Sequence, residues 1–395
     1  MPSNAKLLSL LLAAPATAEI LFATSYNDHA VTSLNLQGSS LSVISKNLDC
    51  GSEPTFLTLD YAKSILYCLN EGWGGSSSLT SYKTSPSGQL ETIKVLPVLK
   101  SPVSSTLYGA NRTKLAVAHY DTSAFSTFSV ADAGAGLAQL SQQTYTLPSP
   151  ATVPERQDAP HLHDAVLDPT GKFILVPDLG SDLVRVYQVG ANDAVTEVSP
   201  IKAVAGSGPR HAAFAKAGRK TFLYTLNELS NTITGYTVTY AKNNKAPTFQ
   251  RIFDFSSHGP GGSVPAGTKA AEIRVSPDNK FVIVSSRGEN TLTIPNTFDA
   301  SNPATTLPSD PLISFKINAE SGALTLVQTA PAGGRNPRGF SLNKKGNLVA
   351  SALQDDNRVV IIERNVRTGL LGKIVAHATV GEGANNGPNY AVFNE

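Results

Sequence analysis

The side chains best suited to chemistry in this sequence are arginines, glutamates and histidines that stand at the ends of short apolar segments. The richest group consists of His163, Arg210, Glu228, Glu272 and Arg287. Guanidinium groups offer forked N–H donors that match carboxylate or phosphate oxygens, so the arginines favour a small anionic ligand. A Glu and a His beside them would supply an acid and a base whose pKa values depend on burial and on neighbouring charges. This combination indicates proton transfer on a carboxylated substrate, including the formation or opening of a lactone, with arginines stabilising the developing oxyanion.

These residues are far apart in the sequence, so the fold must bring them together. Each stands at the start or the end of a predicted strand, and such positions would gather at one rim of a ring of sheets. Rim positions of the same kind predict the residues that contact the substrate: His161, His211, Glu272, Arg338 and Gln354. Buried Arg–Glu pairs can instead serve only to tie neighbouring sheets together, and this structural role is the alternative for each residue.

A repeat of roughly fifty residues predicts the elements that would position these side chains. Each unit has a strand, a turn and a second strand, with the clearest copies at 163–178, 210–228, 272–284 and 338–350 and weaker ones starting at Pro54 and Pro102. A third strand and a fourth strand follow, as at 358–362 and 321–326. Four antiparallel strands per unit, repeated around a ring, leave only short protected sheet edges, which is the β-propeller arrangement.

The number of first strands sets the size of the ring. They begin near Pro54, Pro102, His161, Pro209, Ala271 and Pro337, and a seventh lies at residues 388–393. That last strand has no partners after it, whereas residues 20–45 predict strands that lack a first one. Joining the two ends would complete one blade. The sequence therefore predicts an all-β, seven-bladed propeller with four antiparallel strands per blade, whereas a pair of β-sandwiches would leave both incomplete ends unexplained.

Composition agrees with this fold and excludes several kinds of partner. Of 395 residues, 41% are hydrophobic, enough for a large core, and only 16% are charged. The 31 Gly and 25 Pro favour strands and turns over long helices. Lys and Arg number 32 against 30 Asp and Glu, with no long run of one sign, so nucleic-acid binding is not expected. We expect a monomer without a membrane span.

Residues 1–18 predict a signal peptide. Lys6 precedes the apolar run 7–14, which is too short to span a bilayer, and Ala16-Thr17-Ala18 has the form of a cleavage site. Cleavage after Ala18 would release a secreted domain of residues 19–395. A buried first strand in a cytosolic protein is the alternative.

Three other features bear on export and on metal binding. The sequence Asn111-Arg112-Thr113 matches the signal for N-glycosylation, and the only two cysteines are Cys50 and Cys68. No His stands near them at metal-ligand spacing, so they predict no zinc site, and a disulfide and two core thiols both remain open. His161 and His163 lack an identifiable third ligand, so no metal is expected.

Several short motifs keep a characteristic order and spacing along most of the chain. They are HLH at 161–163, LDPTGK at 167–172, VPDLG at 176–180, GPRH at 208–211, NEL at 227–229, AEIRVSPD at 271–278 and RG at 287–288. Together they resemble the seven-bladed propeller lactonase family, which includes 6-phosphogluconolactonases and the fungal 3-carboxy-cis,cis-muconate lactonizing enzyme, also called carboxymuconate cyclase.

The resemblance implies roles for particular residues. The set proposed for the cyclase branch is one His, two Arg and one Glu, which falls on His163, Arg210, Glu228 and Arg287. Arg210 and Arg287 would hold carboxylates, and Glu228 or His163 would move a proton during reversible, cofactor-independent ring closure. Gly339 stands where the family often has His, which removes an imidazole from the rim.

Two functions of different classes follow from these expectations. The first is a secreted lactonase or lactonizing enzyme that acts on a small carboxylated substrate. Muconate and phosphogluconate metabolism are intracellular, so an exported member is expected to have another substrate. The second is a non-catalytic exported propeller that serves as a surface antigen, an adhesin or a ligand-binding module, because a fold alone does not determine a function.

Overall fold

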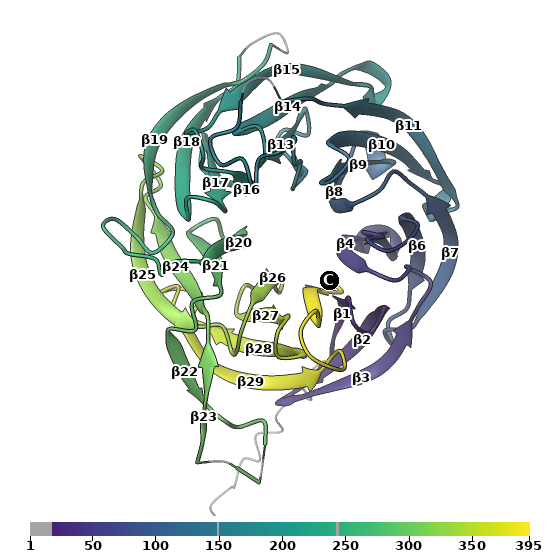
Figure 1. Ribbon diagram of the computed structural model, residues 1–395. Coiled ribbons are helices and arrows are strands. Elements are labelled where there is room, and N and C mark those ends of the chain that lie inside the picture. The colour runs from purple at the N-terminus through teal and green to yellow at the C-terminus, as the bar shows by residue number, and fades with distance from the viewer. Residues whose placement is uncertain (1–17, 148–149, 242–244, 300, 303) are drawn as a thin grey trace, which may run out of the picture.

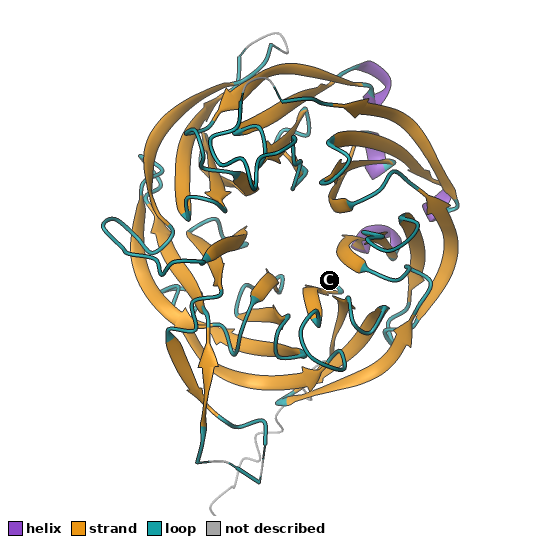
Figure 2. Cartoon of the chain, viewed as in Figure 1, coloured by secondary structure: helices purple, strands orange, loops and turns teal. Residues whose placement is uncertain are grey.

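The computed structural model describes residues 18–147, 150–241, 245–299, 301–302 and 304–395. Seven four-stranded antiparallel sheets are arranged as blades around a common axis (Figure 1), which confirms the predicted propeller. Strands dominate the ring (Figure 2), and the described helices are the short 3-10 turns η1 (Tyr61–Lys63), η2 (Ala110–Arg112), η3 (Asp132–Gly134) and η4 (Ala191–Asp193). None of the described helices has the length and hydropathy needed to cross a membrane.

Each blade is a meander whose first strand lies nearest the axis. Blade 1 contains β4 (Pro54–Asp60), β5 (Ile65–Asn70), β6 (Ser78–Thr84) and β7 (Leu90–Pro97). Blade 2 contains β8 (Pro102–Tyr108), β9 (Lys114–His119), β10 (Ala124–Ala131) and β11 (Gly136–Thr144). Blade 3 contains β12 (Val166–Leu167), β13 (Phe173–Asp178), β14 (Leu183–Val189) and β15 (Val195–Lys202). Blade 4 contains β16 (Pro209–Ala217), β17 (Lys220–Asn227), β18 (Thr232–Thr239) and β19 (Thr248–Ser256).

The remaining blades include an insertion and the closure of the ring. Blade 5 contains β20 (Lys269–Val275), β21 (Phe281–Arg287), β24 (Pro311–Ile317) and β25 (Leu324–Pro331), and the hairpin β22 (Leu292–Pro295) and β23 (Thr306–Ser309) interrupts it. Blade 6 contains β26 (Pro337–Leu342), β27 (Leu348–Leu353), β28 (Arg358–Arg364) and β29 (Leu371–Thr379). Blade 7 contains β30 (Pro388–Phe393), β1 (Glu19–Ser25), β2 (Ala30–Gln37) and β3 (Ser40–Asn47).

The two ends of the chain close the ring as predicted. The C-terminal strand β30 pairs antiparallel with the N-terminal strand β1, with Phe22 opposite Val392 and Leu21 opposite Phe393. The proposed signal peptide, residues 1–18, lies outside the described residues except for Ala18, which directly precedes β1.

Apolar side chains between the blades form the core. Phe222 and Tyr224 of blade 4 pack with Val282 and Phe315 of blade 5 in one such cluster. Strands β5 and β13 are buried along their whole length because each has a neighbouring blade on both faces. This explains why second strands are continuous apolar runs in the sequence.

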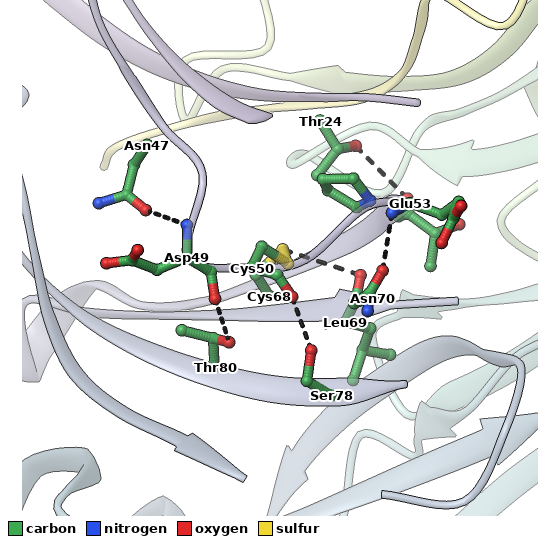
Figure 3. Close-up of a disulfide and its surroundings, with 12 residues drawn as sticks. Thr24, Asn47, Asp49, Cys50, Glu53, Cys68, Leu69, Asn70, Ser78 and Thr80 are labelled. Carbon is green, nitrogen blue, oxygen red and sulfur yellow. Dashed lines mark hydrogen bonds between the residues drawn. A yellow bond between two sulfur atoms is a disulfide. The ribbon is translucent and has the colours of Figure 1, made fainter. Parts of the chain in front are cut away.

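A disulfide joins Cys50 to Cys68, with their Cα atoms 5.9 Å apart (Figure 3). Cys50 lies in the connection from blade 7 to blade 1, and Cys68 lies on β5. The same connection is held by the Ser78 hydroxyl, which donates to the carbonyl of Cys50 at 2.6 Å. Of the two states left open by the sequence, the structure therefore has the disulfide. Asn111, the predicted glycosylation site, is exposed in η2.

Blade 3 differs from the prediction at its innermost strand. The strand was expected to start near His161, but only an isolated bridge between Leu162 and Asp178 precedes the two-residue β12. The Asp164 carboxylate accepts hydrogen bonds from Ser104 of blade 2 at 2.6 Å and from the Ala212 N–H of blade 4 at 3.1 Å. The Asp164 side chain thereby connects blades 2, 3 and 4 at the place where backbone hydrogen bonds between the first two strands of blade 3 were expected.

Candidate functional site

A bulge or an irregular pairing at the start of the innermost strand turns one side chain toward the axis in blades 1–4, 6 and 7. In blade 4, Pro209 pairs with Asn227 and His211 with Leu226, so Arg210 is the extra residue. Bulges commonly re-aim side chains in this way. The equivalent residues in other blades are Thr55, Val103, His163, Arg338 and Asn389. All of them line a narrow cavity of about 20 Å³ on the axis, which we call the neck.

A second ring of residues stands just beyond the bulges. Glu71, Tyr120 and Glu228 each follow the second strand of their blade, and their N–H groups donate to the chain that enters the first strand, at 2.8–2.9 Å. Together with neighbouring side chains they form a wider cavity of about 220 Å³, which we call the upper cavity. Its lining consists of Glu71, Val103, Tyr120, Arg156, His163, Glu228, Lys269, Arg287 and Arg338.

Glu228 is the centre of a cluster of three arginines. Its Oε2 lies 2.9 Å from Nε of Arg210 and 2.9 Å from a terminal nitrogen of Arg287. Its Oε1 accepts a hydrogen bond from Arg156 at 2.6 Å. Glu228, Arg210 and Arg287 are all buried, so these ion pairs are shielded from water and from salt.

The charge state of Glu228 follows from this environment. Burial alone would raise the pKa of the carboxyl group, but Arg287, Arg210 and Arg156 outweigh it and hold the pKa far below its usual range. The carboxylate is therefore ionised at neutral pH and both oxygens are engaged. Such a group is a weak proton acceptor, so the geometry favours a role in holding arginines over the proton transfer expected from the sequence.

The arginines differ in how freely they can meet a ligand. Burial and the positive charge of Arg287 lower the pKa of Arg210 to about 9, although the negative charge of Glu228 acts to raise it. Arg210 also donates a hydrogen bond to the carbonyl of Ala271. Among the described residues, no side chain or carbonyl forms a hydrogen bond or ion pair with the guanidinium of Arg338, which lies 5.8 Å from the centre of the Tyr26 ring. Burial disfavours its charge, yet Tyr26 and Glu71 outweigh burial and raise its pKa. Arg338 is thus a charged donor with unused N–H groups at the cavity.

His163 is the imidazole that lies beside this cluster. It lines both the upper cavity and the neck, and its Nδ1 is buried without a hydrogen-bond partner in the described chain. Burial, followed by the charges of Arg210 and His211, holds its pKa well below the usual value. His163 is therefore neutral at physiological pH. Its low pKa makes it a weaker base than an ordinary imidazole, but its unpartnered Nδ1 is free to take a proton, whereas both oxygens of Glu228 are engaged by arginines.

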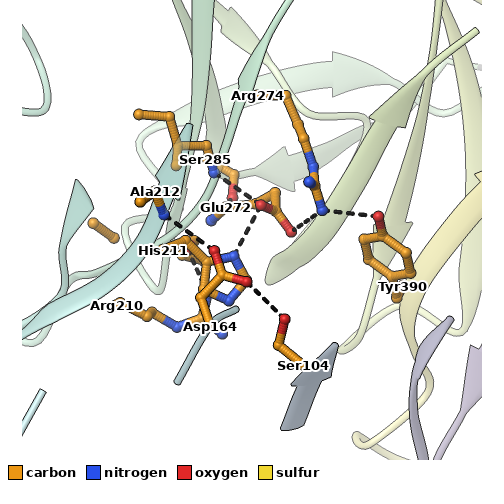
Figure 4. Close-up of polar contacts among 12 residues, drawn as sticks. Ser104, Asp164, Arg210, His211, Ala212, Glu272, Arg274, Ser285 and Tyr390 are labelled. Carbon is orange, nitrogen blue, oxygen red and sulfur yellow. Dashed lines mark hydrogen bonds and ion pairs between the residues drawn. The ribbon is translucent and has the colours of Figure 1, made fainter. Parts of the chain in front are cut away.

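A second polar network surrounds His211 and Glu272 at the neck (Figure 4). Nδ1 of His211 lies 2.9 Å from Oε1 of Glu272, and Oε2 of Glu272 lies 3.2 Å from Arg274. Arg274 also donates to the hydroxyl of Tyr390 at 2.8 Å. These contacts join blades 4, 5 and 7 across the axis.

The structure brings most of the predicted site residues together. His163, Arg210, Glu228 and Arg287 form one connected group, and Arg338 lines both cavities. His211 and Glu272 line only the neck.

His161 and Gln354 line neither cavity, so their positions do not support the predicted contact with substrate. Both ring nitrogens of His161 are engaged, by the carbonyl of Tyr120 at 3.2 Å and by Asp158 at 3.0 Å, and its ring stacks on Tyr120. Gln354 is buried, and its carbonyl accepts from Gly387 at 2.8 Å in the segment that leads into β30. His161 supports Tyr120, and the last connection of the ring packs on Gln354.

Three polar lining residues, Tyr120, Lys269 and Arg156, were not identified from the sequence. Tyr120 occupies the same repeat position as Glu71 and Glu228, so the register of the repeat could have identified it. Lys269 pairs with Arg287 at the first position of β20. Arg156 belongs to the loop between β11 and β12, outside the repeat, and nothing in the sequence indicated it. In the part of the chain that the structure describes, no three His, Cys, Asp or Glu side chains are grouped as metal ligands would be.

Comparisons with known proteins agree with this architecture. The family model described as "Lactonase, 7-bladed beta-propeller" matches residues 20–385. A "Probable 6-phosphogluconolactonase" of Arthroderma benhamiae is 30% identical over 347 residues, which cover 87% of this chain and 81% of the relative. A 6-phosphogluconolactonase of Bacillus subtilis is 25% identical over 328 residues, covering 80% and 82% of the two chains.

A solved structure shows the same fold. The periplasmic gluconolactonase of Pseudomonas aeruginosa superposes with a TM-score of 0.77 at 24% identity and covers 95% of this chain and 99% of its own. At this level of identity the likeness concerns the fold alone.

Proposed function

Because the chain belongs to the seven-bladed β-propeller lactonase family, we propose that it hydrolyses a small anionic lactone in the upper cavity. The observation that carries the proposal is a neutral imidazole, His163, beside a group of guanidiniums that includes the unpaired Arg338. The two relatives described above are named as 6-phosphogluconolactonases, whose substrate is itself an anionic lactone. These names favour hydrolysis over the ring closure of a carboxymuconate.

The charge and size of the cavity support an anionic and small substrate. Its lining carries four cationic side chains, from Arg156, Lys269, Arg287 and Arg338, against two carboxylates, from Glu71 and Glu228. A volume of about 220 Å³ is below the range of roughly 300–1,000 Å³ that is typical of pockets for drug-sized ligands. Phosphate or carboxylate groups on the substrate would pair with the forked donors of Arg338.

The residues of the cavity can divide the reaction among them. Arg338 and Lys269 bind the anionic substituent of the lactone. His163 takes a proton from water while the water oxygen bonds to the lactone carbonyl carbon, and Arg287 stabilises the negative oxygen that forms. The bond between that carbon and the ring oxygen then breaks, and the ring oxygen takes a proton, so that a hydroxy acid is released. Glu228 keeps Arg210 and Arg287 in place.

We also propose that the protein is exported. The predicted cut after Ala18 would leave β1, which begins at Glu19, complete. A disulfide and an exposed glycosylation sequence are both typical of an oxidising, extracytoplasmic compartment. Expression of the full chain in a secreting host tests this, because the N-terminal residue of protein recovered from the medium should be Glu19. Retention in the cells with an intact N-terminus would refute it.

Hydrolysis is tested with a panel of lactones of matched ring size and different charge. We expect 6-phosphogluconolactone and carboxylated lactones to be opened faster than neutral gluconolactone, above the spontaneous rate of each. His163→Gln should abolish the enzymatic rate with the fold intact. Thermal stabilisation by these ligands without any turnover would instead support the alternative of a non-catalytic binding module.

A further inference from the structure

We propose that His211 and Glu272 form a proton-accepting pair behind His163, and that this pair holds the proton released when water attacks the lactone. The inference rests on the proposed lactonase activity and assigns a positioning role to two residues of the neck.

The pair is buried and its geometry is well defined. His211 is 5% exposed and Glu272 is 1% exposed. Oε1 of Glu272 accepts from the Ile273 N–H at 3.0 Å and lies 2.9 Å from Nδ1 of His211, while Oε2 lies 3.2 Å from Arg274 (Figure 4). The carboxylate is therefore fixed in place by two groups besides the imidazole that it orients.

This geometry determines the tautomer of His211. Burial would raise the pKa of Glu272, but Arg274 and His211 lower it to about 2, so the carboxylate is ionised and can only accept hydrogen bonds. In the neutral ring, Nδ1 of His211 must then carry the hydrogen and Nε2 the lone pair. No described group donates a hydrogen bond to Nε2. A base oriented by a buried carboxylate is the arrangement found in catalytic triads.

The position of His163 connects this pair to the substrate cavity. The rings of His163 and His211 are 5.2 Å apart between centroids, and both line the neck. His163 alone of the two also lines the upper cavity. A proton on His163 would stand near the guanidiniums of Arg210 and Arg338, which disfavour it, whereas a proton on His211 would stand beside the carboxylate of Glu272.

The proposed step conserves every proton. The attacking water gives one proton to His163 as its oxygen bonds to the carbonyl carbon, and His163 passes a proton to Nε2 of His211. When the bond to the ring oxygen breaks, the proton returns by the same route to that oxygen. The groups that face His211 during this exchange are Arg210 on its own strand, His163 and Asp164 of blade 3, Glu272 and Arg274 of β20, Arg338 of β26 and Tyr390 of β30.

The test compares His211→Ala and Glu272→Gln with His161→Ala as a matched control, since His161 is also a buried, carboxylate-paired histidine but lies outside both cavities. We expect His211→Ala to lower kcat for the best lactone by about 100-fold or more with KM little changed, and added imidazole to restore part of the rate. Glu272→Gln should lower kcat and shift the acid limb of its pH profile. His161→Ala should show neither imidazole rescue nor a shifted profile.

A readout independent of turnover accompanies the kinetics. Nitrogen NMR of labelled wild-type protein should show the neutral His211 ring with its hydrogen on Nδ1, and Glu272→Gln should change that distribution. A wild-type enzyme whose His211→Ala variant is folded and fully active would overturn the relay and leave the lactonase assignment standing. Hydrogen on Nε2 in the wild type would also overturn the relay. A wild type that opens no lactone would overturn both proposals.

Discussion

Replacing Glu228 by Gln tests whether this residue holds arginines or moves a proton. The substitution keeps the size of the side chain and removes one negative charge that lies 2.6–2.9 Å from three guanidinium groups. Two of the three, Arg210 and Arg287, are buried, whereas the side chain of Arg156 is 31% exposed and contributes least. Each buried contact is worth about 4 kcal/mol at an effective dielectric constant near 20, and the cost of burying the ions offsets much of the sum.

The expected net loss is therefore that of a buried ion pair with one partner removed, about 3–5 kcal/mol. Urea unfolding of the wild type and of Glu228→Gln at pH 7 measures this loss of unfolding free energy. Because the pKa of Glu228 is depressed in the folded state, its stabilisation is present above the unfolded-state pKa of about 4.3 and is lost as the pH falls toward the folded-state pKa. The difference between wild type and variant should thus be constant from neutral pH to about 5 and shrink below about 4.

The kinetic constants separate the two roles of Glu228. If it holds the arginines, Glu228→Gln should raise KM for anionic lactones together with the loss of stability. Glu320→Gln, which removes an exposed partner of Lys220, is the control and should change neither. A variant as stable as the wild type, with unchanged KM and a kcat lowered at least 100-fold, would refute this reasoning and identify Glu228 as the proton carrier.

Three further predictions concern the cavity and the ring. Arg338→Ala should raise KM for a phosphorylated lactone by about 10- to 100-fold and leave KM for a neutral lactone unchanged, and equal effects on both would contradict its role as the anion-binding group. Reduction of the Cys50–Cys68 disulfide, which closes a separation of 18 residues, should lower the free energy of unfolding by about 3 kcal/mol in urea titrations, and identical curves with and without reductant would show that the bond does not contribute. Deletion of residues 388–395 removes β30 and exposes the edge of β1, so circular dichroism should show no cooperative thermal transition, and a wild-type transition would show that the ring does not depend on this closure.

Much of the fold could be predicted because its information is local and repeated. Alternating strands and Gly-containing turns recur in every blade, and the incomplete ends at residues 20–45 and 388–393 require each other. The prediction was wrong in detail where side chains replace the ladder, as Asp164 does at the start of blade 3. The periodic pattern of the sequence does not show where a side chain takes the place of ladder hydrogen bonds, because the partners of that side chain lie in two other blades.

The central residues of the candidate site were predictable, but its full lining and the roles of its residues were not. The repeat placed His163, Arg210, Glu228 and Arg287 at equivalent ends of strands, and a ring must bring such ends together. Arg156 enters from a loop outside the repeat, and His161 turns to support Tyr120, so neither outcome could be read from the pattern.

The sequence by itself determined the ring, its seven blades and the charges that would meet at one mouth, because these depend on short-range patterns that any copy of the repeat displays. Only the tertiary structure decided which charges neutralise each other. The carboxylate of Glu228 pairs with three arginines, whereas no described carboxylate pairs with Arg338. Which arginine is paired and which is free depends on distances of a few ångströms between residues from different parts of the ring.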